Sequence, residues 1–138
     1  MITDKEKFEQ FKRDLRSYSF KQKELKLMED ELIRLSAILH EAGAIRYDEE
    51  KLSFGDPYIT KYLDEMDEYD ELESRKEAIE AFLSEVDAIL QKCEFNVREA
   101  LIECYIKGKP HDVVAQDYLF FHRQQMYRDM ERELKDIL

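Results

Sequence analysis

The chain has 138 residues, which suits one compact domain or a small domain with a long helical extension, and excludes two domains of ordinary size. Charged residues make up 40% of it and only three glycines and two prolines interrupt it, so helix formers dominate and we expect an all-α protein. The formal net charge of −11 argues against a protein that simply coats nucleic acid, because Lys and Arg supply most non-specific affinity for phosphates.

Residues from about 4 to 42 have the pattern of one long amphipathic helix. Their apolar positions are three or four residues apart, with one position skipped near Gln22, and they form a single stripe: Phe8, Phe11, Leu15, Tyr18, Leu25, Met28, Leu32, Leu35 and Leu39. At about 1.5 Å per residue this helix is roughly 55 to 60 Å long, so it needs an equally long partner. Gly43 is predicted to end it.

A loop is expected at about 43–57, because the segment contains a Gly-Asp-Pro turn signal and no helical period. A second amphipathic helix follows at about 58–91, with apolar residues three, four or seven positions apart: Tyr62, Met66, Tyr69, Leu72, Ile79, Phe82, Val86 and Ile89 or Leu90. Two such helices joined by one reversal predict an antiparallel coiled-coil hairpin over residues 1–91. A second copy of the chain could also cover the stripes, so we expect a homo-oligomer formed through the long helices.

The sequence offers no support for an enzyme, a metal site or a cofactor. The acidic run from Asp64 to Glu73 goes all round a helix instead of alternating in a calcium loop, so we interpret it as a solvated face. His40-Glu41 lacks the second histidine of a zinc-protease motif, and the scattered glycines cannot form a phosphate-binding loop. Cys93 and Cys104, eleven positions apart, are predicted to lie on one helix face as core thiols without a disulfide.

The N-terminus does not have the pattern of a targeting signal. Its sequence MITDKEKFEQ lacks the apolar core of a signal peptide. No apolar run in the chain approaches the roughly 20 residues that cross a bilayer. We therefore expect a cytoplasmic protein with no membrane partner.

Residues 92–138 are predicted to form a small helix-turn-helix domain. A helix pattern runs from Phe95 to Ile106 and Gly108 stops it, and Pro110 then opens a short second helix. A final helix runs from about Phe121 or His122 to the last residue, with one inward stripe: Met126, Met130, Leu134 and Ile137. The second short helix and the final helix are the two helices of the predicted motif.

The opposite face of the final helix carries side chains that can contact DNA bases. Arg and Gln pair bidentately with guanine and adenine edges, and base contacts fall at the N-terminal end of the second helix of the motif. Residues 92–138 are nearly neutral, with 8 basic and 9 acidic residues, whereas residues 1–91 carry 14 basic and 24 acidic ones. We expect DNA contacts at bases or nearby phosphates from Arg123, Gln124, Gln125 and Arg128, and on the backbone from Lys107, Lys109 and Arg132. His122 is also expected to belong to the DNA-binding residues.

Residues 92–138 contain several short motifs that occur together in a known type of protein. They are Tyr105-Ile106-Lys107-Gly108, Val114-Ala115, Tyr127-Arg128 and Leu134, preceded far upstream by Ile45-Arg46-Tyr47-Asp48 after the first helix. With these motifs the chain resembles region 4 of sigma factors, and more closely the RinA/ArpU-type transcriptional regulators of phages and prophages. The resemblance implies a regulator that activates late or packaging genes by binding double-stranded promoter DNA, with contacts to RNA polymerase.

The predicted turn departs from the pattern of that family. Leu119 stands where Gly or Asn is usual, and Phe121 or His122 opens the last helix where Ser or Thr is usual, so the hydroxyl N-cap is missing. Counted from Ala115, the inward residue Met126 falls one place late, so either the turn is one residue longer or the motif is degenerate. The alternative function is a non-enzymatic interaction module, whose acidic hairpin binds a basic partner protein and whose helix-turn-helix is degenerate and only caps the bundle. In a degenerate motif the apolar residues 119–121 are instead an exposed knob for a protein partner.

Overall fold

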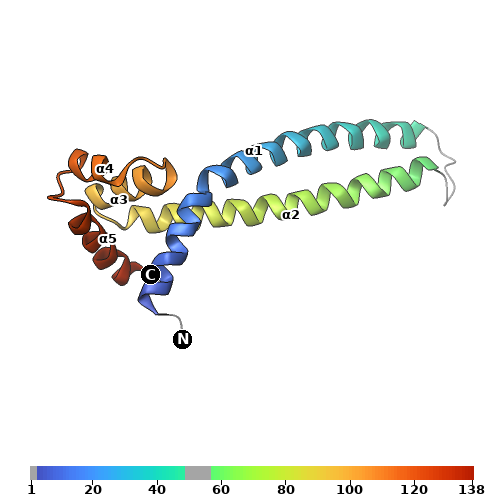
Figure 1. Cartoon of the computed structure of the whole chain (residues 1–138). Helices are drawn as coiled ribbons and strands as arrows, with labels where there is room; N and C mark the ends of the chain where they lie inside the picture. Colours follow the sequence, from blue (N-terminus) through green and yellow to red (C-terminus); the bar gives the residue numbers. More distant parts are fainter. Residues whose placement is uncertain (1–2, 49–56) are drawn as a thin grey trace. The chain divides into compact units, whose positions relative to one another are not determined.

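The computed structural model describes residues 3–48 and 57–138, and the side chains of residues 3–41 and 61–138. All the elements in these ranges are helical, so the predicted all-α fold is confirmed (Figure 1). In chain order they are α1 (Asp4–Asp48), α2 (Pro57–Gln91), α3 (Phe95–Leu101), the π-helical segment η1 (Ile102–Ile106), α4 (His111–Asp117) and α5 (Arg123–Ile137). None of the helices in the described ranges has an apolar stretch of the length needed to cross a membrane.

The chain divides into two compact units. The terminal unit contains residues 1–22 and 82–138, and the central unit contains residues 23–81. This division differs from the boundary expected between residues 91 and 92. The long helices α1 and α2 each take part in both units, because their outer ends carry apolar side chains that pack with the short helices α3, α4 and α5.

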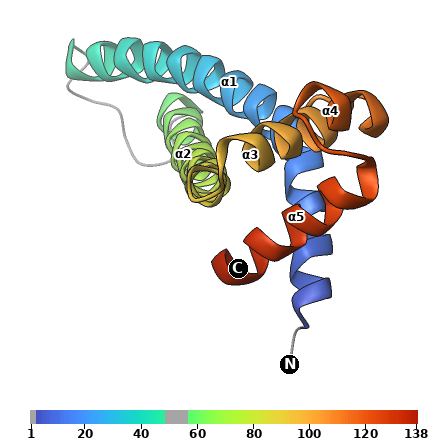
Figure 2. The same cartoon turned by 90° about the vertical axis from the view of Figure 1, so that its left-hand side faces the viewer.

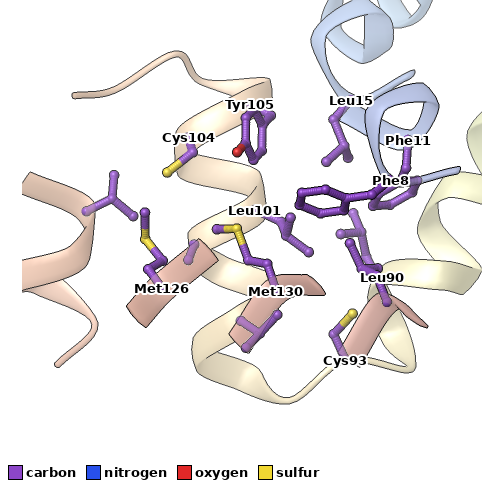
Figure 3. Close-up of a cluster of buried hydrophobic side chains, with 14 of the residues drawn as sticks. Phe8, Phe11, Leu15, Leu90, Cys93, Leu101, Cys104, Tyr105, Met126 and Met130 are labelled. Atoms are coloured by element: carbon purple, nitrogen blue, oxygen red, sulfur yellow. The ribbon is translucent and has the colours of Figure 1, made fainter. Parts of the chain in front are cut away.

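The core of the terminal unit joins the two ends of the chain. Phe8, Phe11 and Leu15 of α1 point toward Leu90 of α2 and Leu101 of α3 (Figure 3). The other buried members come from the end of α2 and from α3 to α5: Val86, Cys93, Val97, Ala100, Cys104, Tyr105, Val114, Ala115, Met126, Met130 and Leu134. The beginning of the stripe expected for the first helix and the stripe expected for the last helix are therefore parts of one core.

The central unit contains the C-terminal part of α1 and the N-terminal part of α2, which run antiparallel and side by side (Figure 1). Met28, Leu32 and Leu35 of α1 and Ile79 of α2 are buried, as their predicted stripes require, whereas Met66 of the stripe predicted for α2 is exposed. Arg75 and Glu24 form an ion pair across the two helices at 3.8 Å. A two-helix layer of this kind buries one narrow apolar seam, and other apolar side chains of the unit, among them Leu27 and Ile33, stay exposed.

The end of α1 differs from the expectation. Gly43 does not stop this helix, which continues to Asp48, so the segment Ile45–Asp48 forms its last turn. A glycine inside a helix costs only about 1 kcal/mol relative to alanine, which a 45-residue helix can tolerate. The remainder of the expected loop, residues 49–56, lies outside the described residues, and α2 begins at Pro57.

The two cysteines are buried free thiols, as predicted, although they do not share a helix. Cys93 lies in the turn after α2, where its amide donates to the carbonyl of Leu90 (3.1 Å), and Cys104 lies in η1. The chain bends between them, so the helical spacing on which the expectation rested does not apply. Burial raises the pKa of both thiols to about 11, which makes them inert core residues.

Candidate nucleic-acid interface

The end of α4 is closed by a left-handed residue, Leu119 (φ 66°). The amide of Phe120 donates to the carbonyl of Ala115 (2.9 Å), and the amide of Leu119 donates to that of Gln116 (3.3 Å), which is the bonding of a Schellman cap. Phe120 packs against the core of the terminal unit, while Leu119 and Phe121 are 88% and 90% exposed. Leu119 thus occupies the conformation that the usual glycine would adopt.

The start of α5 has a side-chain cap, so the expectation of a missing N-cap is wrong. His122 is the N-cap residue, and its Nδ1 accepts a hydrogen bond from the amide of Gln125 at 3.1 Å. The side chain of Gln125 accepts in turn from the amide of Phe121 at 2.9 Å. An imidazole nitrogen therefore does what the hydroxyl of Ser or Thr does in other caps.

Three buried side chains fix the orientation of α5 about its own axis: Met126, Met130 and Leu134. Gln124 and Arg128 are four positions apart on the opposite face and are exposed. Arg123 lies at the side of the helix, also exposed, with Asp112 of α4 at 3.8 Å. These three predicted site residues lie together over the first turns of α5.

The other predicted site residues of α5 have partners within the unit. Gln125 is half-buried and takes part in the cap with His122. Arg132 is exposed and forms an ion pair with Asp129 at 3.1 Å. Their side chains are therefore less available for contacts than those of Gln124 and Arg128.

Lys107 and Lys109 lie apart from this face and hold a buried carboxylate. Glu103 of η1 is 6% exposed, and its oxygens lie 2.9 Å from Nζ of Lys107 and 2.5 Å from Nζ of Lys109. These ammonium groups, Lys109 first, lower the pKa of Glu103. Gly108 turns the chain between them in the left-handed conformation (φ 68°). The first role of both lysines is thus to compensate a buried charge.

Two basic residues of α1 lie beside the C-terminal helices, and sequence reasoning missed them. The guanidinium carbon of Arg16 is 5.5 Å from the ring centroid of Tyr105, and Nζ of Lys12 is 5.8 Å from it. His111 of α4 packs edge-on against the same ring, with centroids 5.4 Å apart. Nothing in the local pattern of α1 indicates this proximity, because about ninety positions separate the residues along the chain.

The protonation of His111 is affected by the positive charges near it. Its Nδ1 shares a hydrogen bond with the hydroxyl of Tyr127. Its pKa is lowered, first because it is partly buried and then because Arg16, Lys12 and Arg123 lie near it. We call Lys12, Arg16, His111 and Arg123 the α1–α4 patch.

The two units differ in net charge as much as residues 1–91 and 92–138 do. The terminal unit contains 14 basic and 15 acidic residues, which gives −1. The central unit contains 8 basic and 18 acidic residues, which gives −10. The candidate interface therefore belongs to a nearly neutral unit. In the part of the chain that the structure describes, no group of three or more His, Cys, Asp and Glu side chains could hold a metal ion.

Comparison of the chain with protein-family models, with curated proteins and with solved structures found no match.

Proposed function

We propose that this protein is a DNA-binding transcriptional regulator whose helix α5 enters the major groove of promoter DNA. The observation that carries the proposal is the exposed face of the first turns of α5, where Arg123, Gln124 and Arg128 lie on a helix held by its cap and by three buried side chains. Arginine and glutamine are side chains that distinguish base pairs in the major groove, and a rigid helix presents them in a fixed register.

The resemblance to RinA/ArpU-type regulators adds the biological setting to this proposal. On that basis the target is promoter DNA of phage or prophage genes, and RNA polymerase is a second partner in the cytoplasm. Exposed apolar residues of the central unit, among them Leu27, Ile33 and Leu63, support self-association through the long helices.

A binding-site selection from random duplexes, followed by affinity measurement over a range of salt concentrations, tests the proposal. We expect Arg128→Ala to weaken binding to the selected site by about 1–3 kcal/mol and to relax the preference at one base pair. The matched control is Lys92→Ala, which removes the same charge from an exposed position in the turn after α2, in the terminal unit. Failure of the wild-type protein to bind any duplex at low ionic strength would contradict the proposed function.

A second candidate function is supported by the charge of the central unit. This unit has ten more acidic than basic residues, and its acidic residues include the run from Asp64 to Glu73. Every acidic side chain of that run is exposed except Glu65, which is half-buried. Such a surface fits a basic partner protein. In this case neutralising the run abolishes capture of the partner, while DNA mobility is the same with and without the protein.

A further inference from the structure

We propose that the start of α1 is a part of the DNA-binding surface, and that Arg16 contacts a backbone phosphate beside the groove that α5 enters. This inference rests on the proposed function and adds to it a contact made by a helix outside the predicted motif. Lys12 and Arg123 strengthen the same site by raising the local positive potential.

The geometry brings the guanidinium of Arg16 to the side of the predicted motif. Figure 2 shows the first turns of α1 passing behind α5, and α1 up to residue 22, α4 and α5 all belong to the terminal unit. Arg16 and His111 are both close to the ring of Tyr105, with the guanidinium carbon 5.5 Å and the imidazole centroid 5.4 Å from its centroid. His111 is the first residue of α4, and its ring is in contact with Tyr127 of α5. Arg16 therefore lies next to the helices that would face DNA.

The side chains of the patch differ in what they can contact. Arg16 is exposed, and a planar guanidinium donates two parallel hydrogen bonds to a phosphate. Lys12 is mostly covered, and its ammonium group lies 4.2 Å from the ring centroid of Phe8 and pairs with Glu9 at 3.1 Å. Arg123 has Asp112 nearby, but at 3.8 Å and in an exposed position this pair is weak. Arg16 is thus the member best placed for a direct phosphate contact.

The charge of the terminal unit gives an independent reason. Its C-terminal part, residues 82–138, contains 8 basic and 11 acidic residues and would by itself repel DNA. Its N-terminal part, residues 1–22, contains 6 basic and 4 acidic residues. The start of the chain is therefore the part of this unit whose net charge is positive, at +2.

The test compares the wild-type protein with Arg16→Gln on one selected duplex and one unrelated duplex over a salt series. Each phosphate contact contributes about 0.9 to the slope of log K against log salt, so we expect Arg16→Gln to lower this slope by about 0.9. Affinity should fall equally on both duplexes, because a phosphate contact carries no base preference. Arg16→Lys should recover most of the slope, since it restores the charge.

The matched control is Lys23→Gln, which removes one charge from an exposed position of the same helix in the central unit. Its slope should equal that of the wild type. If the wild type binds DNA and Arg16→Gln behaves like Lys23→Gln, the contact proposed for α1 is wrong while the proposed function stands. If the wild type binds no duplex, both are wrong. Thermal unfolding of each variant verifies that the exposed substitutions leave the fold intact.

Discussion

At the scale of single residues, the surroundings of His111 disfavour the protonated form of its imidazole. The ring lies partly buried between Tyr105 and Tyr127 and near the positive charges of Arg16 and Lys12. All of these neighbours except the tyrosines disfavour an added proton, so the pKa of His111 is lowered below its usual value near 6.5. In the unfolded chain the usual pKa returns, and the two states then bind different numbers of protons.

We predict that His111 makes the protein less stable as the pH falls from about 7.5 to 5.5. Above the unfolded pKa both states hold a neutral imidazole and nothing is lost. Below it the unfolded chain binds a proton that the folded chain resists, so the free energy of unfolding decreases as the pH falls toward the lower, folded pKa. The variant His111→Gln should lose less stability over this range in urea titrations.

The control for this prediction is His40→Gln, which removes a histidine from an exposed position of α1. It should keep the pH dependence of the wild type. The buried Glu103 has its pKa lowered below the usual 4.5, so the stability that it contributes is lost only at more acid pH than this range covers. Equal slopes of stability against pH for the wild type and His111→Gln would refute the assignment.

At the scale of helices, the chain ends α4 with a residue that is poorly suited to its backbone. Leu119 has a φ of 66°, a conformation that costs an L-residue roughly 1–2 kcal/mol and glycine almost nothing. Its side chain is exposed and contributes little burial in return. The Schellman hydrogen bonds and the packing of Phe120 impose this conformation on Leu119.

We predict that Leu119→Gly stabilises the protein by up to about 1 kcal/mol. The gain is the released backbone strain, reduced by the greater freedom of glycine in the unfolded chain. Urea unfolding monitored by circular dichroism measures it. Leu119→Ala is the matched variant, because it removes the same exposed side chain but keeps the Cβ atom that causes the strain. A glycine variant no more stable than the alanine variant would show that the left-handed backbone is not strained.

The positions of the helices could largely be predicted from the sequence, since each has a clear apolar period. The stripe of α1 is buried or half-buried at all its expected positions from Phe8 to Leu39, and Met126, Met130 and Leu134 are buried in α5. The prediction that the first helix ends at Gly43 is wrong, because a glycine signals the end of a helix only where the helix lacks other support.

The candidate site was predictable only where it is local in sequence. The exposed face of α5 follows from helical spacing, and it contains Arg123, Gln124 and Arg128. The cap formed by His122 and the ion pairs of Glu103 depend on the backbone path, which composition does not give. The contact of Arg16 with Tyr105 depends on the packing of the two chain ends.

At the scale of the whole molecule, the start of α1 and the C-terminal helices form one unit with a shared core. The buried Phe8, Phe11 and Leu15 bring the start of α1 into the core that also contains Leu101 and Met130. Burial of three such side chains contributes on the order of 5–8 kcal/mol, comparable with the whole stability of an ordinary domain. The helices of the candidate interface therefore depend for their stability on a segment a hundred residues upstream.

We predict that Phe11→Ala, a change in α1, destabilises α5. Truncating a buried phenylalanine costs about 3–5 kcal/mol, and here the cavity opens in the core shared with Met130. The free energy of opening that hydrogen exchange gives for the amides from Met126 to Leu134 should decrease by the same amount, so these amides should exchange faster. The matched control is Phe20→Ala, whose side chain is 67% exposed on the same helix and which should change stability by less than about 0.5 kcal/mol. Unchanged protection of α5 in Phe11→Ala would mean that the C-terminal helices fold independently of α1, and the division of the chain at residue 91 expected from the sequence would then be the correct one.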